Sequence, residues 1–240
     1  MSIANLEPDS FSSAAFPTAA AVLVEARVDR ERYLPYKRAL DMMACLVALP
    51  LLLLLMGVIA LCIVLDSKGS PLFVQERVGK DGRRFRLYKF RTMRADYDGQ
   101  ADREYMQSFV AGQMGERPDG QDAINKPIRT DDITRVGRFL RKASLDEVPQ
   151  VFNVLKGEMS LIGPRPNVPW ETDAYLEWHR ERLAVLPGIT GLAQVHGRSS
   201  LTFNEIAAYD IEYVRTLSLR ADLAIMLGTA RVVITRKGAL

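Results

Sequence analysis

The sequence has little of what builds disulfide-bonded or zinc-binding proteins, since it holds two cysteines and two histidines in 240 residues. Cys45 and Cys62 both lie in one apolar stretch, which favours packing over a disulfide. His179 and His196 have no metal-ligand spacing with either cysteine. We therefore expect neither a disulfide framework nor a zinc site.

Charge of one sign is also scarce, because 32 lysines and arginines nearly balance 29 acids and leave a net charge of +3. Proteins that bind nucleic acid usually carry a pronounced basic face, so nucleic acid is not an expected partner. A length of 240 residues suits one domain with attached segments.

A long apolar run is present at residues 42–65, which carry no charge. A helix of that length can just cross a hydrocarbon core of about 30 Å. Pro50 removes a helix hydrogen bond, so the chain can break there, turn back and leave by the leaflet that it entered. A single kinked span is equally compatible with the proline. In both geometries the basic pair Lys37-Arg38 marks the cytoplasmic side.

A β-hairpin is predicted after the apolar run. Residues 72–78 and 83–91 are strand-like and flank the turn 79–82, which contains two glycines. The period of two places two cations, Lys89 and Arg91, on the same face as two apolar residues. They either present positive charge to a phosphate or extend to water.

Two adjacent acids, Asp146 and Glu147, stand at a predicted helix start. Either Ser144 and Glu147 form a capping box, or Asp146 is itself the cap. Both registers place the acids in the first turn, where the helix dipole favours negative charge and bound phosphate. Capping alone is the simpler interpretation, but it leaves the nearby Arg141 and Arg165 unexplained.

The C-terminal third holds further signals. Residues 187–191 are turn-rich and lead to Arg198, with glycines that let backbone approach a ligand. Residues 203–216 are predicted to be helical and carry Asp210. Apolar residues recur at helical spacing over residues 219–233, which indicates a core-facing helix or one lying flat on a bilayer. By contrast, residues 95–132 predict a helix followed by a mobile loop.

These motifs, together and in order, resemble those of the bacterial sugar transferases, the monotopic polyprenyl-phosphate hexose-1-phosphate transferases. The resemblance runs from about Lys37 to the C-terminus. It is carried by Lys37-Arg38 with Asp41, the proline-broken apolar run, and residues 88–93, 144–150, 163–166 and 187–198.

The resemblance implies a mostly helical α+β fold. Residues 37–68 would form a membrane-inserted, re-entrant helix-break-helix hairpin, with Pro50 as the break. A small β-hairpin and amphipathic surface helices would surround a cytoplasmic catalytic domain at residues 69–240. Outside the resemblance, residues 1–36 are predicted to be a flexible N-terminal tail, because their first half is rich in Ser, Ala and Pro and has no periodicity, and residues 19–32 fit a short surface helix. The protein would lie at the bacterial inner (cytoplasmic) membrane, and family analogy also allows a homodimer.

The implied reaction transfers a sugar 1-phosphate from a UDP-sugar to undecaprenyl phosphate and releases UMP, as the first membrane step of exopolysaccharide or other surface-glycan synthesis. Asp146 maps onto the nucleophile, which would form a covalent phosphosugar intermediate. Mg²⁺, contacted by Asp146, would neutralise the diphosphate. Glu147 would position groups and manage protons. The implied phosphate-binding residues are Lys89, Arg141, Arg165 and Arg198, with Asp210 in support.

A non-enzymatic membrane adaptor is the alternative from a different functional class. In that hypothesis the acid pair only caps a helix, and the basic residues bind anionic lipid head groups. Release of UMP from a UDP-sugar separates the two hypotheses.

Overall fold

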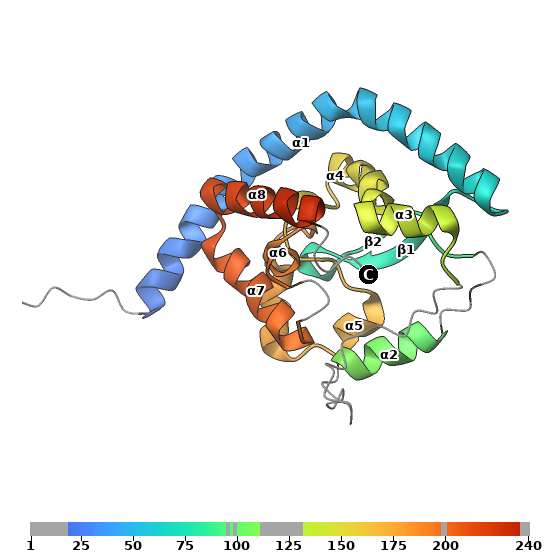
Figure 1. The fold of residues 1–240 in the computed structure, drawn as a ribbon. Coiled ribbons are helices and arrows are strands. Elements are labelled where there is room, and N and C mark those ends of the chain that lie inside the picture. Colours follow the sequence, from blue (N-terminus) through green and yellow to red (C-terminus); the bar gives the residue numbers. More distant parts are fainter. Residues whose placement is uncertain (1–18, 95–96, 98–99, 111–131, 198–200, 236–240) are drawn as a thin grey trace, which may run out of the picture.

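The structure is a computed structural model that describes residues 19–94, 97, 100–110, 132–197 and 201–235. This part of the chain is mostly helical, with two two-stranded sheets and one long apolar helix, α1. Figure 1 shows α1 arching over one side of the other elements. The predicted mostly helical α+β composition is confirmed, while Arg198 and residues 1–18 lie outside the described residues.

Helix α1 spans Ala19–Asp66 and contains both Pro35 and Pro50. It begins inside the segment that the sequence assigned to the tail. The predicted interruption at Pro50 is wrong for the backbone, because the helix continues through this residue and bends along its course (Figure 1). Proline removes one hydrogen bond, and the turns on either side can stay helical around a kink.

One face of α1 packs on the domain and the other is exposed. The inner face includes Lys37, Asp41, Cys45, Met56, Ile59 and Ile63, all buried. The outer face is apolar and includes Leu46, Val47, Leu51, Leu54, Leu61 and Leu65, all exposed. Within the described residues, Glu31–Asp66 is the one helical stretch long and apolar enough to cross a membrane. An exposed apolar face of this length is consistent with membrane anchoring.

The predicted β-hairpin is confirmed. Strand β1 (Leu72–Val78) pairs antiparallel with β2 (Arg84–Phe90), and the short helix η1 (Lys80–Gly82) makes the turn. Phe85 and Leu87 on β2 are buried in the core that also holds α1 residues. Lys89 follows on the same face, so the core-facing side of β2 leads directly to the candidate site.

The acid pair lies in a short 3-10 helix. Helix α3 (Arg135–Ala143) ends at Ser144, which has a left-handed φ of 55°, and η3 (Leu145–Gln150) follows before α4 (Val151–Lys156). The predicted capping box is wrong, since the Ser144 side chain makes no capping hydrogen bond. The acids do occupy the first turn, as both predicted registers required.

The glycine-rich stretch after Pro187 is a strand rather than an open turn. Strand β4 (Gly188–Thr190) pairs in parallel with β3 (Ser160–Ile162). A Cβ on Gly188 would overlap the backbone of Gly163. This glycine therefore allows one backbone to pack against another, and the approach of backbone to a ligand stays a prediction.

The remaining helices surround these sheets. They are α2 (Gln100–Val110), α5 (Pro169–Asp173), η4 (Glu177–Ala184), α6 (Leu192–His196), α7 (Phe203–Thr216) and α8 (Leu219–Thr235). Helix α2 confirms the predicted helix within residues 95–132, while residues 111–131 of the loop predicted after it lie outside the described residues, and α7 confirms its own prediction. The stripe on α8 is not core, because Leu219, Leu223, Met226 and Leu227 are exposed while Asp222 and Ile225 are buried. Of the two predicted roles for this stripe, the exposed face favours contact with a bilayer.

Candidate active site

The two acids of η3 have different partners. Lys89 Nζ donates to Glu147 Oε1 at 2.9 Å, and Arg165 Nη1 donates to the same oxygen at 3.1 Å. Lys89 comes from β2, while Arg165 comes from the loop after β3. Within the described residues, no hydrogen bond or ion pair occupies the Asp146 carboxylate. The fold therefore commits Glu147 to two cations and leaves Asp146 available.

The electrostatics separate the two carboxyl groups further. Burial raises the pKa of Glu147, but Lys89 and Arg165 outweigh it and lower this pKa to about 2. For Asp146, burial is the largest cause, and it raises the pKa above its ordinary value despite the nearby Lys89. Adjacent acids whose pKa values are pushed apart take different roles in active sites. Glu147 stays ionised as an anchor for cations, so the structure favours positioning over proton transfer for this residue.

Arg141 completes the basic surroundings of Asp146. Its Nε donates to Thr92 Oγ1 at 3.0 Å, which holds the guanidinium beside the end of β2. The Arg141 charge also lowers the pKa of Asp146, although by less than burial raises it. Three of the four predicted phosphate-binding residues, Lys89, Arg141 and Arg165, thus surround the acid pair.

Among the described residues, Asp210 does not pair with any of these site residues. It is completely buried on α7 and forms an ion pair with Arg182 of η4. Sequence reasoning missed Arg182, because η4 and α7 are separate elements and nothing in the local pattern pairs the two residues. It also missed Arg77 on β1, whose pKa is influenced by both Arg165 and Glu147. Both arginines donate hydrogen bonds to backbone carbonyls of the loop that carries Arg165.

The residues around Asp146 could hold a magnesium ion only together with the phosphates of a substrate. The described residues contain no cluster of three or more acidic, histidine or cysteine side chains able to hold a metal. Mg²⁺ is commonly held by one or two carboxylates together with substrate phosphates. A single uncommitted carboxylate, Asp146, is compatible with that arrangement.

Comparison with known proteins places this geometry in context. The family model for bacterial sugar transferase matches residues 32–236. The galactosyl transferase CpsE of Streptococcus agalactiae is 39% identical over 207 residues, which cover 85% of this chain and 43% of CpsE. The UDP-glucose:undecaprenyl-phosphate glucose-1-phosphate transferase of Caulobacter vibrioides is 38% identical over 211 residues, covering 85% of this chain and 71% of that protein.

A third relative is similar in length to this chain. The exopolysaccharide production protein ExoY of Sinorhizobium fredii is 36% identical over 208 residues, covering 85% of this chain and 87% of ExoY. Several other relatives are much longer, and the chain spans less than half of the length of CpsE.

Proposed function

The chain belongs to the bacterial sugar transferase family, and on that premise we propose that it transfers a sugar 1-phosphate from a UDP-sugar to undecaprenyl phosphate. UMP is the other product. The name of the Caulobacter relative describes a transfer of this kind with glucose, and the ExoY name places another relative in exopolysaccharide production. The observation that carries the proposal is an available carboxylate, Asp146, beside three cations.

The proposed reaction has two displacements at one phosphorus. An Asp146 carboxylate oxygen attacks the sugar-bearing phosphorus of the UDP-sugar, and the bond from that phosphorus to UMP breaks with its electron pair leaving on UMP. An oxygen of undecaprenyl phosphate then attacks the phosphorus of the aspartyl phosphosugar. The bond to Asp146 breaks, which regenerates the carboxylate and gives the lipid diphosphosugar.

The cations stabilise the charge that develops during both displacements. Lys89 and Arg165 are fixed by Glu147, so they need little reorganisation when phosphate oxygens approach. Arg141 lies on the side of Thr92 and contributes a third positive charge. Mg²⁺, when bound, would neutralise charge on the diphosphate oxygens. The roles of Arg198 and Asp210 in substrate binding and support remain predictions from the family resemblance.

A UMP-release assay tests this function. The purified protein is mixed with Mg²⁺, undecaprenyl phosphate and each member of a panel of UDP-sugars. We expect UMP to form with at least one sugar and to require undecaprenyl phosphate for repeated turnover. If the protein binds anionic vesicles but releases no UMP with any sugar, the membrane adaptor is the better account.

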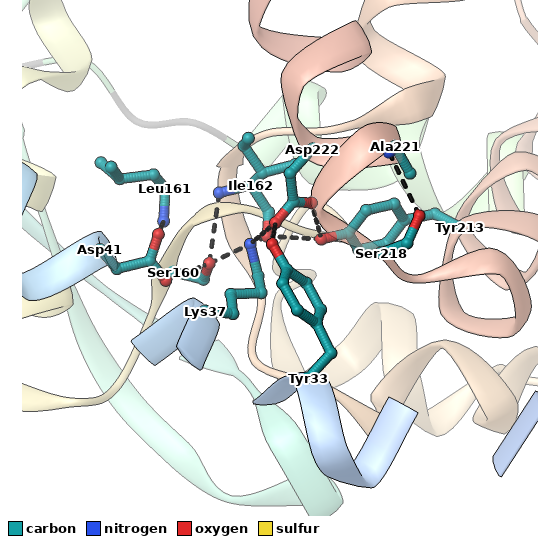
Figure 2. A network of polar contacts seen from close by, with 10 residues as sticks. All are labelled: Tyr33, Lys37, Asp41, Ser160, Leu161, Ile162, Tyr213, Ser218, Ala221 and Asp222. Carbon is teal, nitrogen blue, oxygen red and sulfur yellow. Dashed lines mark hydrogen bonds and ion pairs between the residues drawn. The ribbon is translucent and has the colours of Figure 1, made fainter. Parts of the chain in front are cut away.

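Contacts at both ends of the apolar run support one membrane geometry. At one end Lys37 Nζ donates to Asp222 at 2.6 Å. Figure 2 draws this contact as a dashed line. At the other end Asp66 accepts from the Val136 amide at 2.9 Å. A straight span would separate these ends by a hydrocarbon core of about 30 Å. Their attachment to the same domain supports a re-entrant segment with both ends on the cytoplasmic face.

Cysteine labelling checks this topology. In a variant lacking Cys45 and Cys62, single cysteines are placed at Glu31 and at Lys68, on either side of the apolar run. We expect a membrane-impermeant maleimide to label neither position in intact cells, and to label both after the inner membrane is opened. The cells have a permeabilised outer membrane and an intact inner membrane. Labelling of one position in such cells would contradict the re-entrant segment and favour a single span.

A further inference from the structure

The backbone of the loop that carries Arg165 is held through its carbonyl groups. We define the Pro-Arg-Pro turn as residues 164–166, in which both prolines lack a backbone N–H. Four consecutive carbonyls, those of residues 164–167, each accept a hydrogen bond. The donors are Gly188 N to Pro164 at 2.9 Å, Arg182 Nη2 to Arg165 at 3.2 Å, Arg77 Nη1 to Pro166 at 3.1 Å, and Val78 N to Asn167 at 2.8 Å.

Two of these four donors are backbone amides of strands, and the other two are arginine side chains. The backbone donors belong to β4 and β1, so the strands supply them whatever side chains they carry. The side-chain donors, Arg77 on β1 and Arg182 on η4, contact the middle of the turn from different elements. Only these two contacts can be removed by substitution without altering the strands.

The Arg182 side chain is held in place by burial and by several hydrogen bonds. Its side chain is 1% exposed, and it pairs with Asp210 on α7 while Nη1 donates to Tyr175 Oη at 3.0 Å. Its third hydrogen bond goes to the Arg165 carbonyl. A guanidinium presents its donors in a fixed planar fork, so anchoring two directions fixes the third. The buried Asp210 thereby acts on the Pro-Arg-Pro turn through Arg182.

Arg77 holds the other side of the turn at an electrostatic cost. Burial and the neighbouring Arg165 charge lower the pKa of Arg77 to about 10, while Glu171 and Glu147 oppose this. A second cation beside Arg165 is unfavourable unless it makes specific contacts. Its two contacts are the Pro166 carbonyl and Gln75 Oε1, the latter at 2.7 Å from Nη2.

We propose that Arg77 and Arg182 are positioning residues that clamp the Pro-Arg-Pro turn and so aim Arg165 at Glu147 and the substrate phosphate. The Arg165 side chain is 47% exposed, so its own packing does not fix its direction. Its direction depends on the ion pair with Glu147 at 3.1 Å and on the backbone that carries the side chain. This inference rests on the proposed transferase function for its kinetic consequences, but the clamp itself is a structural claim.

A double-mutant cycle measures whether Arg77 acts through Arg165. We expect Arg165→Met to lower kcat/KM by about a hundredfold, mainly through kcat, because it removes a donor to developing charge. Arg77→Met should lower it by roughly tenfold, because the turn loses one side of its clamp. Adding Arg77→Met to Arg165→Met should cost no more than about another twofold. A full additional tenfold loss would show that Arg77 acts independently of Arg165.

Matched controls separate positioning from general damage. Arg84→Met removes an exposed arginine of the same hairpin, whose partner Glu76 lies at 3.5 Å, and should leave kcat/KM unchanged. Arg215→Met is the matched control for substitution of Arg182. Arg215 pairs with Glu181 at the surface, so this variant should also leave kcat/KM unchanged. Arg77→Lys keeps a donor in a similar place and should recover part of the loss. If Arg77→Lys is as impaired as Arg77→Met while both fold, the carbonyl contact is not what matters.

Hydrogen exchange tests the clamp without any enzymatic readout. The amides of Gly163 and Val168 flank the turn and donate to Thr190 O and Glu171 Oε2. We expect both amides to exchange at least about tenfold faster in Arg77→Met and in Arg182→Met than in the control variants. Unchanged exchange would overturn the clamp even in an active enzyme. Faster exchange in a protein that releases no UMP would keep the clamp and reject the transferase function.

Discussion

Replacing Asp146 with asparagine is expected to lower UMP release by at least about a thousandfold, which is the scale of loss when a nucleophile is removed. Asparagine has nearly the same shape as aspartate, so packing around η3 should survive. Its amide oxygen is a poor nucleophile and carries no charge. Because Glu147 is already bound to Lys89 and Arg165, it is poorly placed to replace Asp146 in the attack.

The proposed covalent intermediate can be measured directly. With a UDP-sugar and no undecaprenyl phosphate, intact-mass spectrometry should show wild-type protein carrying one sugar phosphate, and Asp146→Asn carrying none. Asp81→Asn is a matched control, since Asp81 has a φ of 56° in the hairpin turn, a conformation that asparagine tolerates. Unchanged turnover in Asp146→Asn would contradict the covalent mechanism. The acid pair would then have a structural role only.

In the proposed mechanism, the contrast between the two acids gives each adjacent carboxylate its own role. A nucleophile needs cations nearby to receive phosphate, but a cation that pairs with the nucleophile would block it. Glu147 resolves this conflict by holding Lys89 and Arg165 at 2.9 and 3.1 Å. The same two cations lower the pKa of Glu147 to about 2, so this carboxylate remains charged at any physiological pH. Proton management, its other predicted role, has no support in this geometry.

The sequence predicted an element correctly where residues close together in the chain decide its conformation. The hairpin followed from two strand-like stretches around a glycine turn, and α7 from its helical periodicity. The register of the acid pair was harder. Ser144 followed three residues later by Glu147 is typical of a capping box, but the left-handed Ser144 ends α3 instead. The Ser144 amide donates to the Arg141 and Leu140 carbonyls, so Ser144 is the C-cap of α3, and the capping-box pattern alone does not show that a helix ends there.

Long-range partners were the least predictable part of the site. Arg182 and Asp210 are buried together, yet they belong to different helices and neither stands in a pattern that indicates a partner. The stripe on α8 was ambiguous for a related reason. Core helices and helices on a bilayer share the same apolar period, and only the packing of Asp222 and Ile225 against the domain tells them apart.

Asp222 is also the residue whose loss should destabilise the fold most. It accepts from Lys37 Nζ at 2.6 Å, Tyr33 Oη at 2.9 Å and Tyr213 Oη at 2.8 Å, the network drawn in Figure 2. Lys37 and Asp222 are both nearly buried, at 7% and 8% side-chain exposure. The network joins the start of α8 to α1 just before the apolar run, so it anchors the apolar segment to the domain.

We expect Asp222→Ala to lower the free energy of unfolding by about 3–5 kcal/mol, because it leaves a buried lysine charge without a partner. For a chain of this size that corresponds to a fall in Tm of roughly 10 °C, measurable by differential scanning fluorimetry in detergent. Glu181→Ala is the control, since it breaks the exposed pair with Arg215 and should cost at most about 1 kcal/mol.

A paired substitution shows whether the unpaired charge is the cause. Lys37→Met combined with Asp222→Leu removes both charges and fills similar volume, so it should regain most of the stability lost in Asp222→Ala. Tyr33 and Tyr213 would each lose one acceptor, but the Tyr213 hydroxyl also donates to the Ile162 carbonyl at 3.1 Å. If Asp222→Ala melts within about 2 °C of the wild type, Lys37 reaches water or another acceptor, and the network does not hold α1 to the domain. If the double variant is no more stable than Asp222→Ala, the loss comes from the tyrosine hydroxyls rather than from the buried charge.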